Sequence, residues 1–143
     1  MFLSQVLKDK GDLVFTASPN ETVGAAAALL HSRRVGAMVI IDDDDRVIGI
    51  LSERDIVRVV AERGAAGLTQ PISSCMTRDV HFAAPNEAVH TLLERMTDRR
   101  VRHLPVIHQG RLAGIVSIGD LVKSKIAETE AEAENLKAYI AAG

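Results

Sequence analysis

The chain has 143 residues, the length of one ordinary globular domain. Apolar residues make up 47% of the sequence and charged residues 25%, which is typical of a folded protein and excludes disordered and collagen-like chains. The 17 basic and 19 acidic residues leave a net charge of −2, and the longest apolar runs have six or seven residues, far below the roughly 20 that cross a bilayer. We therefore expect neither nucleic acid nor a membrane among its partners.

The amino terminus predicts a short amphipathic turn, carried by Phe2, Leu3, Val6 and Leu7. This segment lacks the basic start, apolar centre and small-residue cleavage site of a secretory signal. The one cysteine, Cys75, cannot form a disulfide within the chain, which agrees with a reducing compartment. Together these features predict a cytoplasmic location.

The sequence contains one unit twice. Identical residues recur 66 residues apart in the first part of the unit and 65 residues apart in its second part. The matching pairs are 19–21 with 85–87, 33–35 with 99–101, 49–50 with 114–115, Ser52 with Ser117, and Asp55 with Asp120. Solenoid repeats are shorter, with periods of roughly 20–50 residues, so this period indicates a duplicated half-domain.

Each copy predicts the same order of elements: strand, helix, strand, strand, helix. The opening strands are expected at Val14–Ala17 and Val80–Ala83. Apolar residues spaced i, i+3, i+4 and i+7 then predict a helix with one buried face. These residues are Val23, Ala26, Ala27 and Leu30 in the first copy and Val89, Leu92, Leu93 and Met96 in the second.

The first helix of each copy has two candidate starts. Ser18–Glu21 matches a capping box with Pro19 at the first helical position. The second copy has Ala84 where the first has serine, so Asn20 and Asn86 are the alternative caps.

A β-hairpin and a second helix complete each copy. Short apolar runs joined by polar turns predict the hairpins, and a serine after each hairpin is the expected start of a helix. The hairpin strands are Met38–Ile41 with Val47–Leu51 and Leu104–Ile107 with Leu112–Val116, and the serines are Ser52 and Ser117.

The two copies are expected to complete one fold. Three short strands cannot shield both faces of a sheet, so we expect an α/β fold in which the copies pack about a pseudo-two-fold axis and form two equivalent clefts. The expected divisions are a first repeat at 12–62, a linker at 63–77, a second repeat at 78–126 and a carboxyl-terminal helix at 127–143.

The carboxyl-terminal segment is rich in alanine and glutamate and predicts a helix. Ile126, Ala133 and Ile140 recur every seven residues, with Thr129 and Leu136 between them. Two heptads do not establish a coiled coil, and packing of this helix on its own domain is the alternative.

Each copy places an acidic residue, Asp55 or Asp120, in the first turn of its second helix. One carboxylate there can accept hydrogen bonds from both hydroxyls of a ribose. Three residues earlier, Ser52 or Ser117 can bind ribose or phosphate beside the free amides of the helix start. The same Ser-x-x-Asp spacing also describes an ordinary capping box, which explains both residues without a ligand.

Leu104-Pro105-Val106, the hairpin that follows and Gly114–Asp120 resemble the signature of the cystathionine-β-synthase (CBS) domain, and Gly49–Asp55 resembles it again. The resemblance covers a tandem pair of such domains, also called a Bateman module. It implies a regulatory module that binds adenosine-containing ligands, such as AMP, ADP, ATP, NAD or S-adenosylmethionine, in clefts between the copies.

The resemblance also implies which residues of the second copy would contact such a ligand. It places Arg100, Arg102 and His103 near the phosphates, and the backbone around Val80 and His81 near the adenine. Cations on phosphate form charge-assisted hydrogen bonds, which are among the stronger ones in proteins. For the paired arginines alone, the alternative is solvated cations at the carboxyl end of a helix.

The first copy departs from this pattern. It keeps Arg34 but has Gly36-Ala37 where the second copy has Arg102-His103. We therefore expect the cleft of Asp120 to be the primary site, and the cleft of Asp55 to be weaker, differently selective or assisted by Arg54.

Other candidate residues predict no metal site and no catalysis. Asp42–Asp45 in a hairpin tip is typical of a solvated turn rather than a metal trap. The five histidines lack paired zinc spacing, and neither Ser52 nor Ser117 lies in the glycine-flanked turn of a nucleophilic serine.

The favoured interpretation is a non-catalytic nucleotide sensor that forms a homodimer and signals to an effector protein through a shift between conformations. AMP, ATP and NAD share the adenosine that these residues would recognise, so the pattern does not choose among them. The alternative is a structural dimerisation module with vestigial, ligand-free clefts. A third hypothesis, an enzyme that acts on nucleotides, predicts turnover of ATP or NAD.

Overall fold

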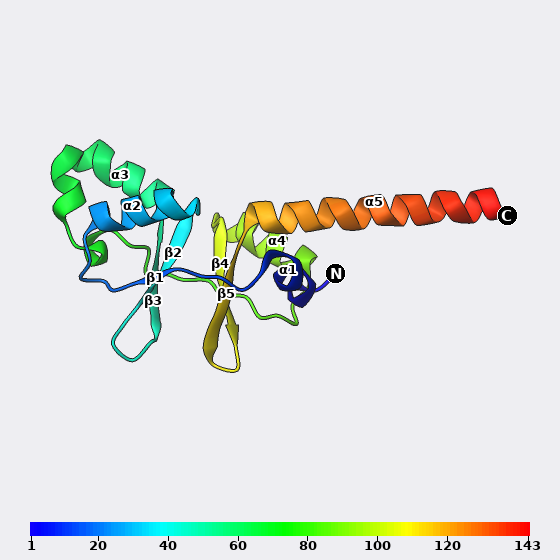
Figure 1. The fold of residues 1–143 in the computed structure, drawn as a ribbon, viewed down its shortest axis with the longest axis horizontal. Coiled ribbons are helices and arrows are strands. Elements are labelled where there is room, and N and C mark those ends of the chain that lie inside the picture. Colours follow the sequence, from blue (N-terminus) through cyan, green and yellow to red (C-terminus); the bar gives the residue numbers. More distant parts are fainter. The chain divides into compact units, whose positions relative to one another are not determined.

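The two copies of the repeat fold around separate apolar cores. The computed structural model describes residues 1–143, which form two compact units: Val14–His81, the first unit, and Met1–Leu13 with Phe82–Gly143, the second unit (Figure 1). The first unit contains β1 (Thr16–Ala17), α2 (Val23–Arg33), β2 (Ala37–Ile41), β3 (Val47–Ser52), α3 (Glu53–Arg63) and the 3-10 turns η1 (Gly64–Thr69) and η2 (Ile72–Ser74). The second unit contains α1 (Leu3–Lys10), α4 (Val89–Arg99), β4 (His103–His108), β5 (Arg111–Ser117) and α5 (Ile118–Ala142).

The first unit has a three-stranded sheet in the order β1-β2-β3, with β1 parallel and β3 antiparallel to β2. Its core joins one face of α2, represented by Leu30, to Met38 and Ile40 of β2 and Leu51 of β3. The predicted hairpin and both predicted helices are confirmed. Each apolar run therefore folds as its spacing indicates, because its side chains meet in this core.

The second unit repeats this arrangement with a shorter sheet, in which β4 and β5 are antiparallel. The opening strand is reduced to one parallel bridge between Ala83 and Val106. In the first unit, the amide of Val39 donates to the carbonyl of Phe15 at 3.0 Å. The residue that corresponds to Val39 is Pro105, which has no amide hydrogen, so the matching bond cannot form. The expected strand over 80–83 is wrong for this reason.

The amino-terminal segment forms a helix, α1, that belongs to the second unit. Leu3 and Val6 lie in its core, with exposed fractions of 0% and 2%. The backbone joins α1 to the turn before α4, because the amide of Leu3 donates to Glu87 at 2.9 Å and the amide of Val89 donates to Met1 at 3.0 Å. The predicted amphipathic turn is therefore two turns of helix that complete the second copy's core.

The predicted helix starts of the two copies are wrong by several residues. Helix α2 begins after Thr22, whose hydroxyl accepts from the amide of Ala25 at 3.1 Å. Helix α4 begins after Ala88 without a side-chain cap. The Ser18–Glu21 motif closes a turn before the helix instead, because the Glu21 carboxylate accepts from the amide of Ser18 at 3.2 Å.

The segment 63–77, expected as a linker, folds with the first unit. Ile72 is fully buried and Met76 is 7% exposed, and both belong to that unit's core. Thr77 pairs with Ile50 at the sheet through two backbone hydrogen bonds of 2.9 Å. The expected boundary between 126 and 127 also differs from the structure, because it falls inside one continuous helix, α5.

None of the helices combines the length and apolar composition needed to cross a bilayer.

The burial of α1 predicts a large energetic role for it. Replacement of Leu3 by alanine removes a fully buried side chain and should lower the free energy of unfolding by about 2–5 kcal/mol. The matched control is Leu13→Ala, where the side chain is 69% exposed and the change should stay within about 0.5 kcal/mol. Urea denaturation followed by circular dichroism measures both. Equal stability of the two variants would contradict the packing of α1.

Candidate functional site

The two Ser-x-x-Asp motifs stand at equivalent corners, where a hairpin strand passes into a helix. At the start of α3, the amide of Ser52 donates to the Asp55 carboxylate at 2.9 Å, and the amide of Asp55 donates back to the Ser52 hydroxyl at 3.4 Å. At the start of α5, the corresponding distances between Ser117 and Asp120 are 2.8 and 3.1 Å. Both motifs are thus complete capping boxes. The local structure of both aspartates is explained without a ligand.

Asp120 has a further partner from α1. The Lys10 ammonium lies 2.6 Å from the same oxygen, Oδ2, that accepts from Ser117, and it also donates to the carbonyl of Ile115. Partial burial raises the pKa of Asp120, but the hydrogen bonds from Lys10 and Ser117 and the charge of Lys10 outweigh it, so the pKa is lowered overall. The side chains of both Asp120 and Lys10 keep 28% of their surface exposed. Asp120 is therefore an ionised, accessible carboxylate.

Asp55 is closed off by comparison. The residue is 3% exposed, and it is the one buried charged residue of the chain. Its second oxygen, Oδ1, accepts from the Thr77 hydroxyl at 3.3 Å and lies 3.1 Å from the Arg58 guanidinium. Both carboxylate oxygens are therefore used within the first unit, one on the cap of α3 and one on Thr77 and Arg58.

The hairpin register brings the predicted cations of the second unit beside its capping box. His103 is the cross-strand partner of Ser117, and the carbonyl of Arg102 accepts from the amide of Ile118 at 2.8 Å. Arg100 ends α4 three residues before β4, with a left-handed backbone (φ 55°). Two of the residues that the sequence singled out for phosphate, Arg102 and His103, thus adjoin the start of α5.

The same corner of the first unit has no counterparts of Arg102 and His103. Ala37 is the cross-strand partner of Ser52, and the carbonyl of Gly36 accepts from the amide of Glu53 at 3.0 Å. Arg34 ends α2 with the same left-handed backbone as its counterpart, and Arg54 is exposed on the first turn of α3. The backbone of the corner is conserved between the copies, whereas its charge is not.

Two further predicted residues, Val80 and His81, lie at the carboxyl end of the first unit. The amide of Val80 donates to the carbonyl of Arg78 at 3.0 Å, and the His81 ring lies 3.6 Å from the Asp79 carboxylate. The structure gives these residues no contact that bears on adenine binding, so their role stays a prediction.

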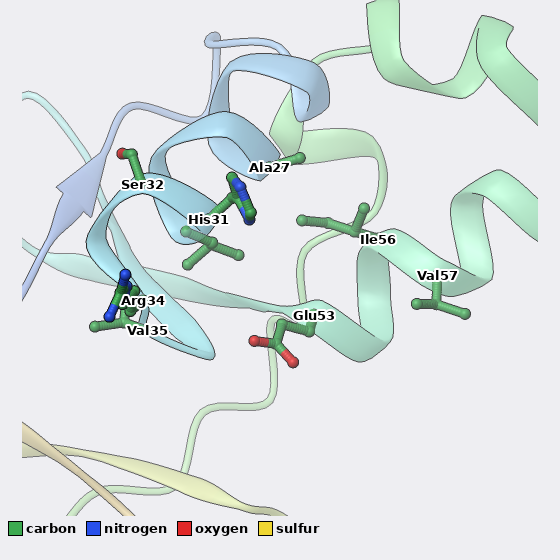
Figure 2. A pocket seen from close by; sticks show the side chains of 9 residues that line it. Ala27, His31, Ser32, Arg34, Val35, Glu53, Ile56 and Val57 are labelled. Carbon is green, nitrogen blue, oxygen red and sulfur yellow. The ribbon is translucent and has the colours of Figure 1, made fainter.

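A cavity of about 640 Å³ lies between α2 and α3 in the first unit (Figure 2). Apolar side chains such as Leu30 and Ile56 line it together with His31, Arg34 and Glu53. Of the predicted ligand residues, Arg34 alone contributes to this lining. The sequence did not predict this cavity. The apolar pattern of each helix indicates the face that packs on the sheet, but it does not indicate the distance between the two helices.

Lys10 is the one residue of the Asp120 site that sequence reasoning missed. It stands 110 positions before Asp120, and no local pattern links the two. Only the packing of α1 into the second unit brings them together.

The remaining candidates have structural explanations. The Asp42 carboxylate accepts from the amides of Asp44 and Arg46, each at 2.9 Å, and so closes the hairpin turn. No cluster of three potential ligands could hold a metal ion. Burial and the charge of Asp55 raise the pKa of the half-buried Cys75 thiol, so this cysteine is a poor nucleophile.

Comparison with known proteins places this geometry in a family. The model of the CBS domain matches the chain twice, at residues 11–62 and 72–126. The CBS-domain containing protein ATU1752 from Agrobacterium tumefaciens is 46% identical, with a TM-score of 0.84 over 87% of this chain and 92% of its own. The CBS domain-containing protein CBSX3, mitochondrial, from Arabidopsis thaliana is 31% identical over 99% of this chain and 72% of its own.

The chain belongs to the CBS-domain family and is a tandem CBS pair with a long carboxyl-terminal helix. It also shares its fold with the CBS domain pair of protein MJ0100, which was solved in complex with 5′-methylthioadenosine and S-adenosyl-L-methionine. That pair is 23% identical, with a TM-score of 0.79 over 90% of this chain and 98% of its own. Because one relative is mitochondrial, the cytoplasmic location stays a prediction.

The Lys10–Asp120 pair predicts an acid-dependent contribution to stability. Because the folded pKa of Asp120 is lowered from its ordinary 3.8, the contribution is complete above that value and is lost as the pH falls through the folded pKa. Lys10→Met should raise the pKa of Asp120, as followed by a carboxyl NMR titration, and should reduce this loss. Lys8→Met, on the exposed last turn of α1, is the control. An unchanged Asp120 pKa in Lys10→Met would contradict the pairing.

Proposed function

We propose that the corner formed by β4, β5 and the start of α5 binds the ribose and phosphates of an adenine nucleotide, and that the protein is a non-catalytic regulatory module. One observation carries this proposal: an ionised, accessible Asp120 lies in the first turn of the helix whose start adjoins Arg102 and His103. A carboxylate accepts from the two hydroxyls of a ribose, whereas guanidinium groups favour phosphate. The two kinds of group at this corner match the two polar parts of a nucleotide.

Lys10 would compete with the ribose for the Asp120 carboxylate. A hydroxyl that donates to Oδ2 of Asp120 takes up the position that the ammonium now holds 2.6 Å away. The displaced ammonium stays on α1, close to the anionic ligand, and can pair with a phosphate. Ligands with phosphate groups therefore gain more from this exchange than neutral nucleosides do.

The ligand class also agrees with the complex of the MJ0100 pair, since both ligands named for that protein contain adenosine. S-adenosylmethionine carries a sulfonium cation next to its ribose. Arg100 and Arg102 would repel that group, and they favour AMP, ADP, ATP or NAD instead. The chain as a homodimer would then signal to an effector protein, because a ligand that binds one arrangement of the protomers more tightly shifts the population toward it.

The first unit favours a second candidate function. Its corner has Gly36 and Ala37 in place of Arg102 and His103, and both carboxylate oxygens of Asp55 are used in contacts within the unit. This copy therefore acts as a structural half of the pair. The alternative function, a structural dimerisation module with vestigial clefts, then applies to the first unit only. That role falls to the first unit, and nucleotide binding falls to the corner of Asp120.

Calorimetry with AMP, ATP and NAD tests the proposal. Wild-type protein should bind at least one of them with a Kd on the order of micromolar. Asp120→Asn keeps the shape of the side chain but loses its charge, and it should weaken that binding by about tenfold or more. The matched variant Asp55→Asn should leave the Kd unchanged.

Two outcomes would contradict the proposal. Equal affinity of the wild type and Asp120→Asn for the nucleotide would remove Asp120 from the site. Turnover of ATP or NAD in the calorimeter cell would show that the protein is an enzyme. Both aspartates cap helices, so thermal unfolding of each variant must first show that the protein is folded.

A further inference from the structure

Helix α5 continues far beyond the elements of its own unit that pack against it. Its first turns pack on α1 and α4, and the remainder extends past both (Figure 1). Every residue from 129 to 143 is exposed, so about four turns of helix have no cover within the chain. Isolated helices of up to about 12–15 residues are marginal in water, which indicates that this segment is stabilised by another molecule. The expectation that the segment packs on its own domain does not hold.

One continuous, mainly apolar stripe of exposed side chains runs along α5. Its members follow each other at alternating steps of four and three residues, the spacing of the a and d positions of a coiled coil. They are Val122, Ile126, Thr129, Ala133, Leu136 and Ile140. Ile126, Leu136 and Ile140 are 53%, 59% and 68% exposed. The stripe runs from the packed part of the helix to its free end, which suits a partner helix lying along its whole length.

The residues that flank the stripe carry complementary charges. In a parallel coiled coil, each g position faces the e position five residues further along the other helix. Lys125 and Glu132 occupy g positions, and Glu130 and Lys137 occupy the e positions that they would face in a second copy. Each of these pairs has opposite charges, and the two-fold symmetry of a homodimer forms each pair twice.

We infer that the carboxyl-terminal helices of two copies of this chain pair in parallel and in register over 122–140, and thereby join two protomers. The stripe and its flanking charges are complementary to themselves, which is the property that a second copy requires of an interface. Within one chain, Lys125 lies 3.2 Å from Glu128 and Lys137 lies 3.5 Å from Glu134. Exposed ion pairs of this kind contribute little to stability, so both lysines can pair with a second helix instead. This inference specifies the homodimer proposed above and does not depend on nucleotide binding.

Disulfide cross-linking of the full chain tests the pairing and its direction. In a Cys75→Ser background, Ile126→Cys and Ile140→Cys each place one cysteine at an a position, where parallel helices bring the two Cα atoms within reach of a disulfide. Both variants should form covalent dimers under mild oxidation. The controls, Ala131→Cys and Ala138→Cys, lie on the opposite face of the helix and should stay monomeric. An antiparallel pair allows a cross-link at one of the two a positions at most, and cross-linking at neither position would overturn the inference.

A charge exchange tests the predicted partners. Glu132→Lys faces Lys137 of the other copy with a like charge, and Lys137→Glu does the same to Glu132, so each variant alone should dimerise about tenfold more weakly. An equimolar mixture of the two variants should recover dimers, since every facing pair is again of opposite charge. The rate of cross-linking in the Ile140→Cys background reports on each case. Unchanged rates in the single variants would overturn the proposed register, whatever calorimetry shows for Asp120.

Discussion

The hydrogen bond between a carboxylate and the main chain at the start of a helix is the constraint on which both halves of this protein depend. It holds the turn from hairpin to helix in each copy and fixes one oxygen of Asp55 and of Asp120. What the rest of the carboxylate can do is decided by neighbours outside the capping motif. Thr77 and Arg58 occupy the second oxygen of Asp55. Lys10, in contrast, shares the oxygen of Asp120 that already serves the cap and leaves the group partly exposed. One motif thus yields a closed structural corner in the first unit and an open, charged corner in the second.

The two copies share the order of their main elements, and substitutions at a few positions change the local structure and charge. Pro105 stands where the first copy has Val39, and the lost amide shortens the opening strand to a single bridge. Arg102 and His103 stand where the first copy has Gly36 and Ala37, so the two helix starts adjoin different side chains. The capping distances hardly change between the copies. In the proposed function, a few side chains on a common backbone therefore distinguish the nucleotide-binding copy from the structural one.

The sequence predicted what depends on local spacing and missed what depends on distant contacts. The hairpins, the helices and the caps at Ser52 and Ser117 are confirmed, because apolar periodicity and a Ser-x-x-Asp spacing act within a few residues. The start of α2 is wrong, because Thr22 competes with Ser18 for the cap and no local rule ranks them. Lys10 was missed because it reaches Asp120 only through the packing of Leu3 and Val6. The sequence also did not predict that the segment 63–77 contributes to the core of the first unit, because this segment lacks a repeating apolar pattern.

In the proposed binding mode, Asp120 exchanges its Lys10 partner for the hydroxyls of a nucleotide ribose, whereas Asp55 does not. A crystal structure of the chain soaked with AMP tests this most directly. We predict density for the ribose within hydrogen-bond distance of Asp120, the Lys10 ammonium moved away from Oδ2, and Asp55 still bonded to Thr77 and Arg58. Density for AMP elsewhere, with Lys10 and Ser117 still sharing the Asp120 carboxylate, would contradict the proposed exchange.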